Sequence, residues 1–95
     1  MTGAAAVILI YHCTSPSEAQ SILDDGFFDD EQSVSDLPVC LRPAPHAVIA
    51  IEWNGTWEDL HVYKWNVGQW PPHGNWYREW RVPGDRLNVC QMRMA

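Results

Sequence analysis

The sequence predicts a small α+β domain, in which one helix near the N-terminus is followed by a mostly antiparallel sheet of five or six strands. Two observations lead to this fold class. The apolar run AAAVILI passes directly into a strong helix-start signal, and later segments are apolar or alternate with polar residues as strands do. Ninety-five residues suffice for one domain, so we expect a single domain over residues 1–95.

The first strand and the helix after it have the clearest signals. Residues 5–13 are apolar and rich in β-branched side chains, as in a central strand buried on both faces. Ser15 is expected as the N-cap, Pro16 as the first helical residue and Glu18 as the end of an S-x-x-E capping box. Gly26 is the expected C-terminal cap. The predicted buried face of this helix consists of Ala19, Ile22 and Leu23.

The rest of the chain is predicted to alternate between strands and loops. Residues 28–36 are acidic without an apolar period, and residues 68–74 are rich in Gly and Pro, so both are expected to be loops. Alternation in the last third places Tyr77, Glu79 and Arg81 on one face of a strand. The strands predicted after the helix cover residues 37–41, 46–53, 60–65, 75–82 and 86–94.

The net charge of −6 is unevenly distributed along the chain. Residues 1–63 contain ten acidic residues and a single basic one, Arg42, whereas residues 64–95 contain five basic residues and two acidic ones. An acidic chain disfavours a large nucleic-acid footprint, which needs many phosphate contacts. The basic C-terminal third can serve a small anionic ligand such as a nucleotide, or its arginines can simply lie on solvated strand faces.

The cysteines and histidines predict neither disulfides nor a metal site. Cys13, Cys40 and Cys90 are widely spaced without a C-x-x-C pattern, which favours reduced thiols in a cytoplasmic protein. No histidine stands at ligand spacing relative to a cysteine, so no metal is expected. The apolar N-terminal run lacks a preceding Lys or Arg and is too short to span a bilayer, so no signal peptide and no membrane contact is expected.

Side chains able to carry chemistry stand at the end of the first strand and within a late strand. His12 and Thr14 lie where a ligand would meet a helix N-terminus, and they equally fit a polar strand exit. Cys13 is a candidate nucleophile or a small buried residue. Glu79 lies within WYREWRV, where a carboxylate is costly unless it pairs with a neighbouring arginine or serves a function. The six tryptophans are expected mainly in core and lid packing, with nucleobase stacking as the alternative.

Two segments resemble motifs of a known enzyme superfamily. YHCTSPSEAQSILDDGF resembles the first motif of the ADP-ribosyltransferase superfamily, in its histidine–tyrosine–glutamate branch of diphtheria-toxin and poly-ADP-ribose-polymerase type. YREWRVPGDRLN resembles the third motif, a strand with the catalytic glutamate followed by a proline-led turn. The likeness covers Val7–Phe27 and Trp76–Asn88. It implies an ADP-ribosyltransferase-like fold with a small split sheet.

The same resemblance implies an enzyme that uses NAD as its substrate. Such an enzyme cleaves the nicotinamide–ribose bond and transfers ADP-ribose to an acceptor, here expected to be a protein rather than a nucleic acid. Toxin-like action is implied, and an antitoxin or a regulatory protein would be a natural partner.

Individual roles also follow from the resemblance. His12 would hydrogen-bond the adenosine ribose of NAD, while Thr14 and the Cys13 backbone would line the seat of the nicotinamide ribose. Glu79 would bond the 2′-hydroxyl of that ribose and stabilise the oxocarbenium-like charge that develops as nicotinamide leaves. The predicted catalytic residues His12 and Glu79 are therefore expected to lie across one cleft. The remaining predicted NAD contacts are Arg42 for the pyrophosphate and Tyr63 or Tyr77 as the ring stacked on nicotinamide.

Two departures from the family pattern keep other functions open. Cys13 replaces the usual glycine or arginine, and the middle motif falls near VCLRP, where only Cys40 and Arg42 are found. This gap favours a catalytically silent domain that binds NAD, ADP-ribose or a protein partner, whereas the retained His12 and Glu79 favour an enzyme. RNA 2′-phosphotransferase chemistry on the same fold is a further alternative, which the net acidity disfavours.

Overall fold

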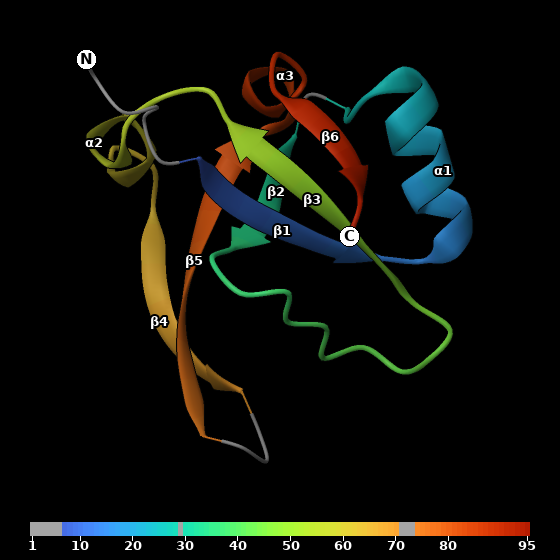
Figure 1. The fold of residues 1–95 in the computed structure, drawn as a ribbon, viewed down its shortest axis with the longest axis horizontal. Coiled ribbons are helices and arrows are strands. Elements are labelled where there is room, and N and C mark those ends of the chain that lie inside the picture. Colours follow the sequence, from blue (N-terminus) through green and yellow to red (C-terminus); the bar gives the residue numbers. More distant parts are fainter. Residues whose placement is uncertain (1–6, 29, 71–73) are drawn as a thin grey trace, which may run out of the picture.

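One antiparallel sheet with three helices makes up the computed structural model, which describes residues 7–28, 30–70 and 74–95 (Figure 1). The helices are α1 (Pro16–Asp25), α2 (Trp57–His61) and α3 (Gly84–Leu87). The strands are β1 (Ile8–Thr14), β2 (Glu31–Ser35), β3 (Ala47–Trp53), β4 (Trp65–Trp70), β5 (Asn75–Pro83) and β6 (Gln91–Met94). They lie in the order β4-β5-β2-β1-β3-β6, and each neighbouring pair is antiparallel. The predicted α+β class is confirmed, but the described strands form one continuous six-stranded sheet rather than a split one.

Helix α1 has the predicted N-cap, C-cap and buried face, but not the predicted reciprocal capping box, because the Glu18 carboxylate accepts the Thr14 hydroxyl instead of the Ser15 amide. The Ser15 hydroxyl accepts a hydrogen bond from the Glu18 amide at 3.2 Å. Gly26 follows the last helical residue with a φ of +87° and donates its amide to the Ile22 carbonyl at 2.7 Å. Because glycine adopts a positive φ without steric cost, this cap depends on the missing side chain at position 26. The α1 residues that pack in or against the core are Ala19, Ile22 and Leu23.

The strands predicted at 5–13, 46–53 and 75–82 are confirmed as β1, β3 and β5, with residues 5 and 6 lying outside the described residues. β1 occupies a central place in the sheet, between β2 and β3. It is not buried on both faces, however, because Tyr11, His12 and Cys13 are only half-buried.

The acidic segment 28–36 contains strand β2, so its prediction as a loop is wrong. β2 is inserted between β1 and β5, and its backbone pairs with both. Val34 is buried in the core, but the polar residues around it give the segment no hydrophobic period. Backbone pairing on two edges therefore forms a strand where the sequence pattern gives no signal.

Four further predictions are wrong in the middle and at the end of the chain. Residues 37–41 form an irregular connection instead of a strand. Much of the predicted strand 60–65 belongs to α2 and the turn after it, and β4 instead continues into the segment 68–74 that was expected to be a loop. The predicted strand 86–94 starts as helix α3 and becomes a strand only at β6.

The misread helix α2 has its own local signal. The Thr56 hydroxyl accepts a hydrogen bond from the Asp59 amide at 3.1 Å, and the Asp59 carboxylate accepts one from the Thr56 amide at 2.9 Å. This reciprocal capping box starts the helix and directs Leu60 into the core, where it is fully buried.

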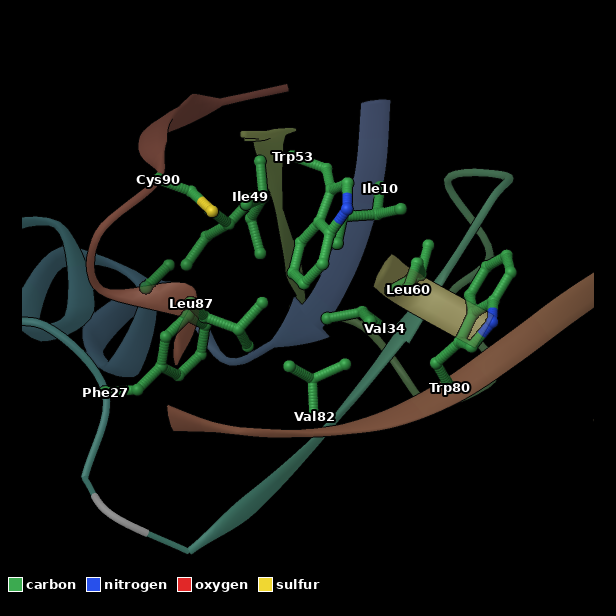
Figure 2. Close-up of a cluster of buried hydrophobic side chains, with 12 residues drawn as sticks. Ile10, Phe27, Val34, Ile49, Trp53, Leu60, Trp80, Val82, Leu87 and Cys90 are labelled. Atoms are coloured by element: carbon green, nitrogen blue, oxygen red, sulfur yellow. The ribbon is translucent and has the colours of Figure 1, made fainter. Parts of the chain in front are cut away.

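The core lies on one face of the sheet, which we call the core face (Figure 2). Ile10 pairs with Ile51 across β1 and β3, and Val34 pairs with Trp80 across β2 and β5, so these buried side chains point to the same side. The three helices pack on this face through Ala19, Leu60 and Leu87.

The tryptophans are less buried than the sequence predicts. Of the five whose side chains are described, Trp53 and Trp80 belong to the core. Exposed side chains are found at Trp57, Trp65 and Trp76.

Cys13 and Cys40 form a disulfide, whereas Cys90 is a buried free thiol. The prediction of reduced thiols is therefore wrong for the first two cysteines. The bond ties central strand β1 to the connection at residues 36–46, and the partners stand 27 residues apart, a spacing that carries no sequence signal. Because disulfides persist in oxidising environments, this bond removes the basis for predicting a cytoplasmic protein.

Candidate functional site

The face of the sheet opposite the core carries a row of polar side chains, and we call it the polar face. Tyr11 of β1 pairs with Ser35 of β2. Ser35 pairs in turn with Glu79 of β5, which pairs with Asn66 of β4. Because paired residues of neighbouring strands point to the same side, these four side chains lie in one row across four strands.

A groove of about 140 Å³ lies on the polar face, and we call it the Glu79 groove. It is lined from the sheet by Tyr11, Cys13, Ser33, Ser35, Tyr77 and Glu79. Val39 and Leu41 line it from the connection 36–46, and Cys40 between them is bonded to Cys13. The disulfide thus fixes one wall of the groove against the sheet. Three predicted site residues, Cys13, Tyr77 and Glu79, are brought together here.

Glu79 is a half-buried residue, and its carboxylate forms no ion pair with any described residue. Arg78, its neighbour in β5, pairs with Asp36 at 3.1 Å instead, and Arg93 pairs with Glu52 at 2.9 Å. The interpretation of Glu79 as one half of an arginine pair is therefore wrong. A carboxylate without a protein partner keeps its oxygens free to accept hydrogen bonds from a ligand.

Basic side chains stand on the other side of Glu79. A second cavity of about 140 Å³ is lined by Lys64, Asn66 and Arg81 together with Glu79 and Trp65. The Arg81 amide donates a hydrogen bond to the Lys64 carbonyl at 2.8 Å, which holds these two residues next to each other. Hydrogen-bond acceptors and positive charges therefore stand side by side on the polar face, as a ligand with both hydroxyl and phosphate groups requires.

The Tyr77 ring lies across Gly68, its partner on β4. A Cβ atom at position 68 would stand 2.5 Å from the Cζ atom of Tyr77, well inside van der Waals contact. Glycine at this position therefore gives the ring its room at the edge of the Glu79 groove.

His12 lies on the core face, where it pairs with the buried Ile49. Its Nδ1 atom stands 2.8 Å from the carbonyl oxygen of Ser33. A carbonyl only accepts, so Nδ1 carries the proton and Nε2 keeps its lone pair. The ring packs edge-on against Phe27, with centroids 5.1 Å apart. Burial lowers the pKa of His12 below its usual 6.5, against the smaller raising effects of the Ser33 bond and the Glu18 charge.

We expect His12 to make the fold less stable at low pH. The pKa of 6.5 applies to the unfolded chain and the folded pKa is lower, so unfolding takes up a proton between the two values. The stability that neutral His12 contributes is present above pH 6.5 and is lost as the pH falls through 6.5 and then through the folded pKa. Denaturant unfolding at about pH 7.5 and about pH 5 measures this loss, which should be smaller in His12→Gln. The same loss in both proteins would contradict a buried neutral His12.

His12 also lines a cavity of about 520 Å³ beside α1, which we call the His12 pocket. The side chains that line it include His12, Glu18, Ile22, Asp25, Phe28 and Gln32. Glu79 does not line this pocket, and His12 does not line the Glu79 groove.

The expectation that His12 and Glu79 lie across one cleft is wrong. His12 stands two residues from the core residue Ile10 and shares its face, whereas Glu79 stands next to the core residue Trp80 and faces the other way. The two side chains therefore lie on opposite faces of the sheet. Their separate roles stay predictions.

Three other predicted contacts lie outside the Glu79 groove. Thr14 is buried and donates its hydroxyl to a Glu18 carboxylate oxygen at 2.7 Å. Tyr63 packs edge-on against the core residue Trp53, with centroids 6.3 Å apart. Arg42 is exposed in the connection 36–46, next to a groove residue but not lining the groove.

Residues of β1 and β2 complete the groove without having been predicted. Tyr11 is part of the strand exit, and its orientation follows only from the strand register. Ser33 and Ser35 belong to the segment expected to be a loop. The one sequence signal for them is their alternation about the single apolar residue Val34.

The described residues contain neither a group placed to hold a metal ion nor a membrane-spanning helix, and comparisons with known proteins give no relative. In the part of the chain that the structure describes, no group of three or more His, Cys, Asp or Glu residues is placed to hold a metal ion. Within the same residues, no helix is long and apolar enough to cross a membrane. Comparison with protein-family models, with curated proteins and with solved structures found no match, so function has to be inferred from the groove and the pocket themselves.

Proposed function

We propose that this chain is a catalytically silent domain that binds an NAD- or ADP-ribose-type ligand in the Glu79 groove. The proposal rests on the Glu79 carboxylate, which forms no ion pair with any described residue and shares its groove with two tyrosines and two serines. The resemblance of the sequence to ADP-ribosyltransferase motifs supports this class of ligand.

The residues of the groove match the groups of such a ligand. An ionised carboxylate accepts hydrogen bonds only, and the neighbouring hydroxyls of a ribose can supply two of them. Tyr11 and Tyr77 offer flat rings with hydroxyl groups to a sugar or a base. Lys64 and Arg81, next to Glu79, supply positive charge for a phosphate.

The size of the groove limits how much of the ligand it holds. Each of the two cavities that share Glu79 has a volume of about 140 Å³. Pockets for drug-sized ligands typically measure about 300–1,000 Å³. The groove therefore holds one sugar with its phosphate, and the rest of a dinucleotide extends over the sheet surface.

A silent domain is favoured over a transferase because the predicted catalytic pair is divided. Glu79 faces the groove, but His12 points to the core face and gives its Nδ1 proton to Ser33. The sulfur of Cys13 is held in a disulfide, so it is not a free nucleophile. The groove keeps the residues for holding a ribose and lacks the histidine that the transferase prediction requires.

Binding of ADP-ribose to the intact chain tests the proposal. Isothermal titration should show saturable binding, and Glu79→Gln should weaken it at least about tenfold, because it removes a charge-assisted acceptor. Glu58→Gln is the matched control, since Glu58 is exposed on α2 and lines neither cavity at Glu79. Gly68→Ala should also weaken binding, because the added Cβ displaces the Tyr77 ring. Equal binding by the wild type and Glu79→Gln would overturn the site.

The transferase remains the second candidate, because the sequence retains Glu79 within its REW motif. Incubation of the protein with labelled NAD distinguishes the two functions. A silent domain binds NAD without releasing nicotinamide, whereas an enzyme releases nicotinamide in a reaction that Glu79→Gln abolishes. Turnover by the wild type would replace the silent-domain proposal with the transferase.

A further inference from the structure

We propose that the His12 pocket is a second binding site, which takes an aliphatic diamine or polyamine in its protonated form. The pocket has a volume of about 520 Å³, within the range of about 300–1,000 Å³ that is typical of sites for small organic ligands. Its walls come from β1, α1, the turn after α1 and β2. The proposal does not depend on the Glu79 groove, which lies on the other face of the sheet.

The charge of the pocket is negative. Glu18 and Asp25 are seven residues apart, which places them on one face of α1 about two turns from each other. One oxygen of Glu18 accepts the Thr14 hydroxyl, which leaves the other for a ligand. Among the described residues no lysine or arginine lines the pocket, and the charged groups that do are the two carboxylates, at opposite ends of the wall.

Two uncharged polar side chains of the pocket, His12 and Gln32, each use one donor on the protein itself. His12 gives its Nδ1 proton to the Ser33 carbonyl, so Nε2 remains as an acceptor. Gln32 donates an amide proton to the Asp30 carbonyl at 3.1 Å, which leaves its side-chain oxygen as an acceptor. A pocket with acceptors to spare matches an ammonium group, which has three donors and no acceptor.

Apolar side chains of the pocket can contact the carbon chain of the ligand. The Phe28 ring, which is 85 % exposed, lines the pocket and leaves its face open to a ligand. Ile22 of α1 contributes further apolar surface. An aromatic face attracts an ammonium group and also covers methylene groups. The two carboxylates with an apolar wall between them favour a ligand with two amino groups over one with a single charge.

Titration of the intact, isotopically labelled chain with cadaverine tests the proposal by NMR. Saturable shifts are expected for the amides of residues at the pocket, while the neutral analogue pentanediol should produce none. Asp25→Asn should weaken cadaverine binding at least about fivefold, and Phe28→Ala should weaken it about threefold. Asp24→Asn is the matched control, because Asp24 carries the same charge on the same helix and does not line the pocket.

Each alternative result overturns the proposal. Equal weakening by Asp24→Asn and Asp25→Asn would mean that cadaverine only senses the acidity of α1. Equal shifts with pentanediol would mean that charge is not recognised, and unsaturated shifts would mean that there is no site. The spectra of the variants also show directly that both exposed substitutions leave the fold intact.

Discussion

Removal of the Cys13–Cys40 disulfide is expected to lower the free energy of unfolding by about 3–4 kcal/mol. The bond closes a loop between residues 27 positions apart, and cross-linking a loop of this length restricts the unfolded chain by about that amount. The cross-link also holds Val39 and Leu41 against the sheet, so its loss should weaken ADP-ribose binding in the Glu79 groove. Stability and the groove thus depend on the same bond.

Denaturant unfolding of the wild type with and without a reductant measures this effect. The double variant with serine at positions 13 and 40 should be as unstable as the reduced wild type, and a reductant should not change it further. Cys90 is free and buried in every one of these samples, so its chemistry is held constant. The same unfolding midpoint for oxidised and reduced wild type would show that the connection 36–46 is held by packing alone.

Local signals predicted the elements that do not depend on distant partners. The caps of α1, Ser15 and Gly26, act within a few residues of the helix, and both are found where the sequence places them. The capping box of α2 is equally local in Thr56 and Asp59, but the alternating residues after it predict a strand. β2 could not be found in this way, because its formation depends on the neighbouring strands β1 and β5.

The candidate site could be predicted only in part. The sequence shows which residues of one strand share a face, but not which face of the sheet is buried. The alternation of β5 placed Tyr77 and Glu79 on one face and Trp80 on the other, which the structure confirms. The resemblance then joined Glu79 to His12, although the same alternation in β1 places His12 with Ile10. These two predictions conflict. Pairing with the neighbouring strands resolves the conflict, because the register determines which face of a strand is buried.

Replacement of Trp80 by alanine is expected to lower the free energy of unfolding by about 3–5 kcal/mol. The Trp80 side chain is 0 % exposed, and its indole nitrogen donates a hydrogen bond to Nδ1 of His61 at 3.1 Å. Its ring also stacks on the His61 ring, with centroids 5.6 Å apart. Alanine would remove these contacts and leave a cavity in the core face.

Trp76→Ala is the matched control for this substitution. Trp76 lies four residues earlier on the same face of β5, but it is 67 % exposed, so its loss should cost less than about 1 kcal/mol. Denaturant unfolding of the two variants compares their free energies of unfolding and so shows whether β5 is anchored in the core through Trp80. If both cost equally little, β5 would not be anchored through Trp80, and the orientation that turns Glu79 away from His12 would lose its physical basis.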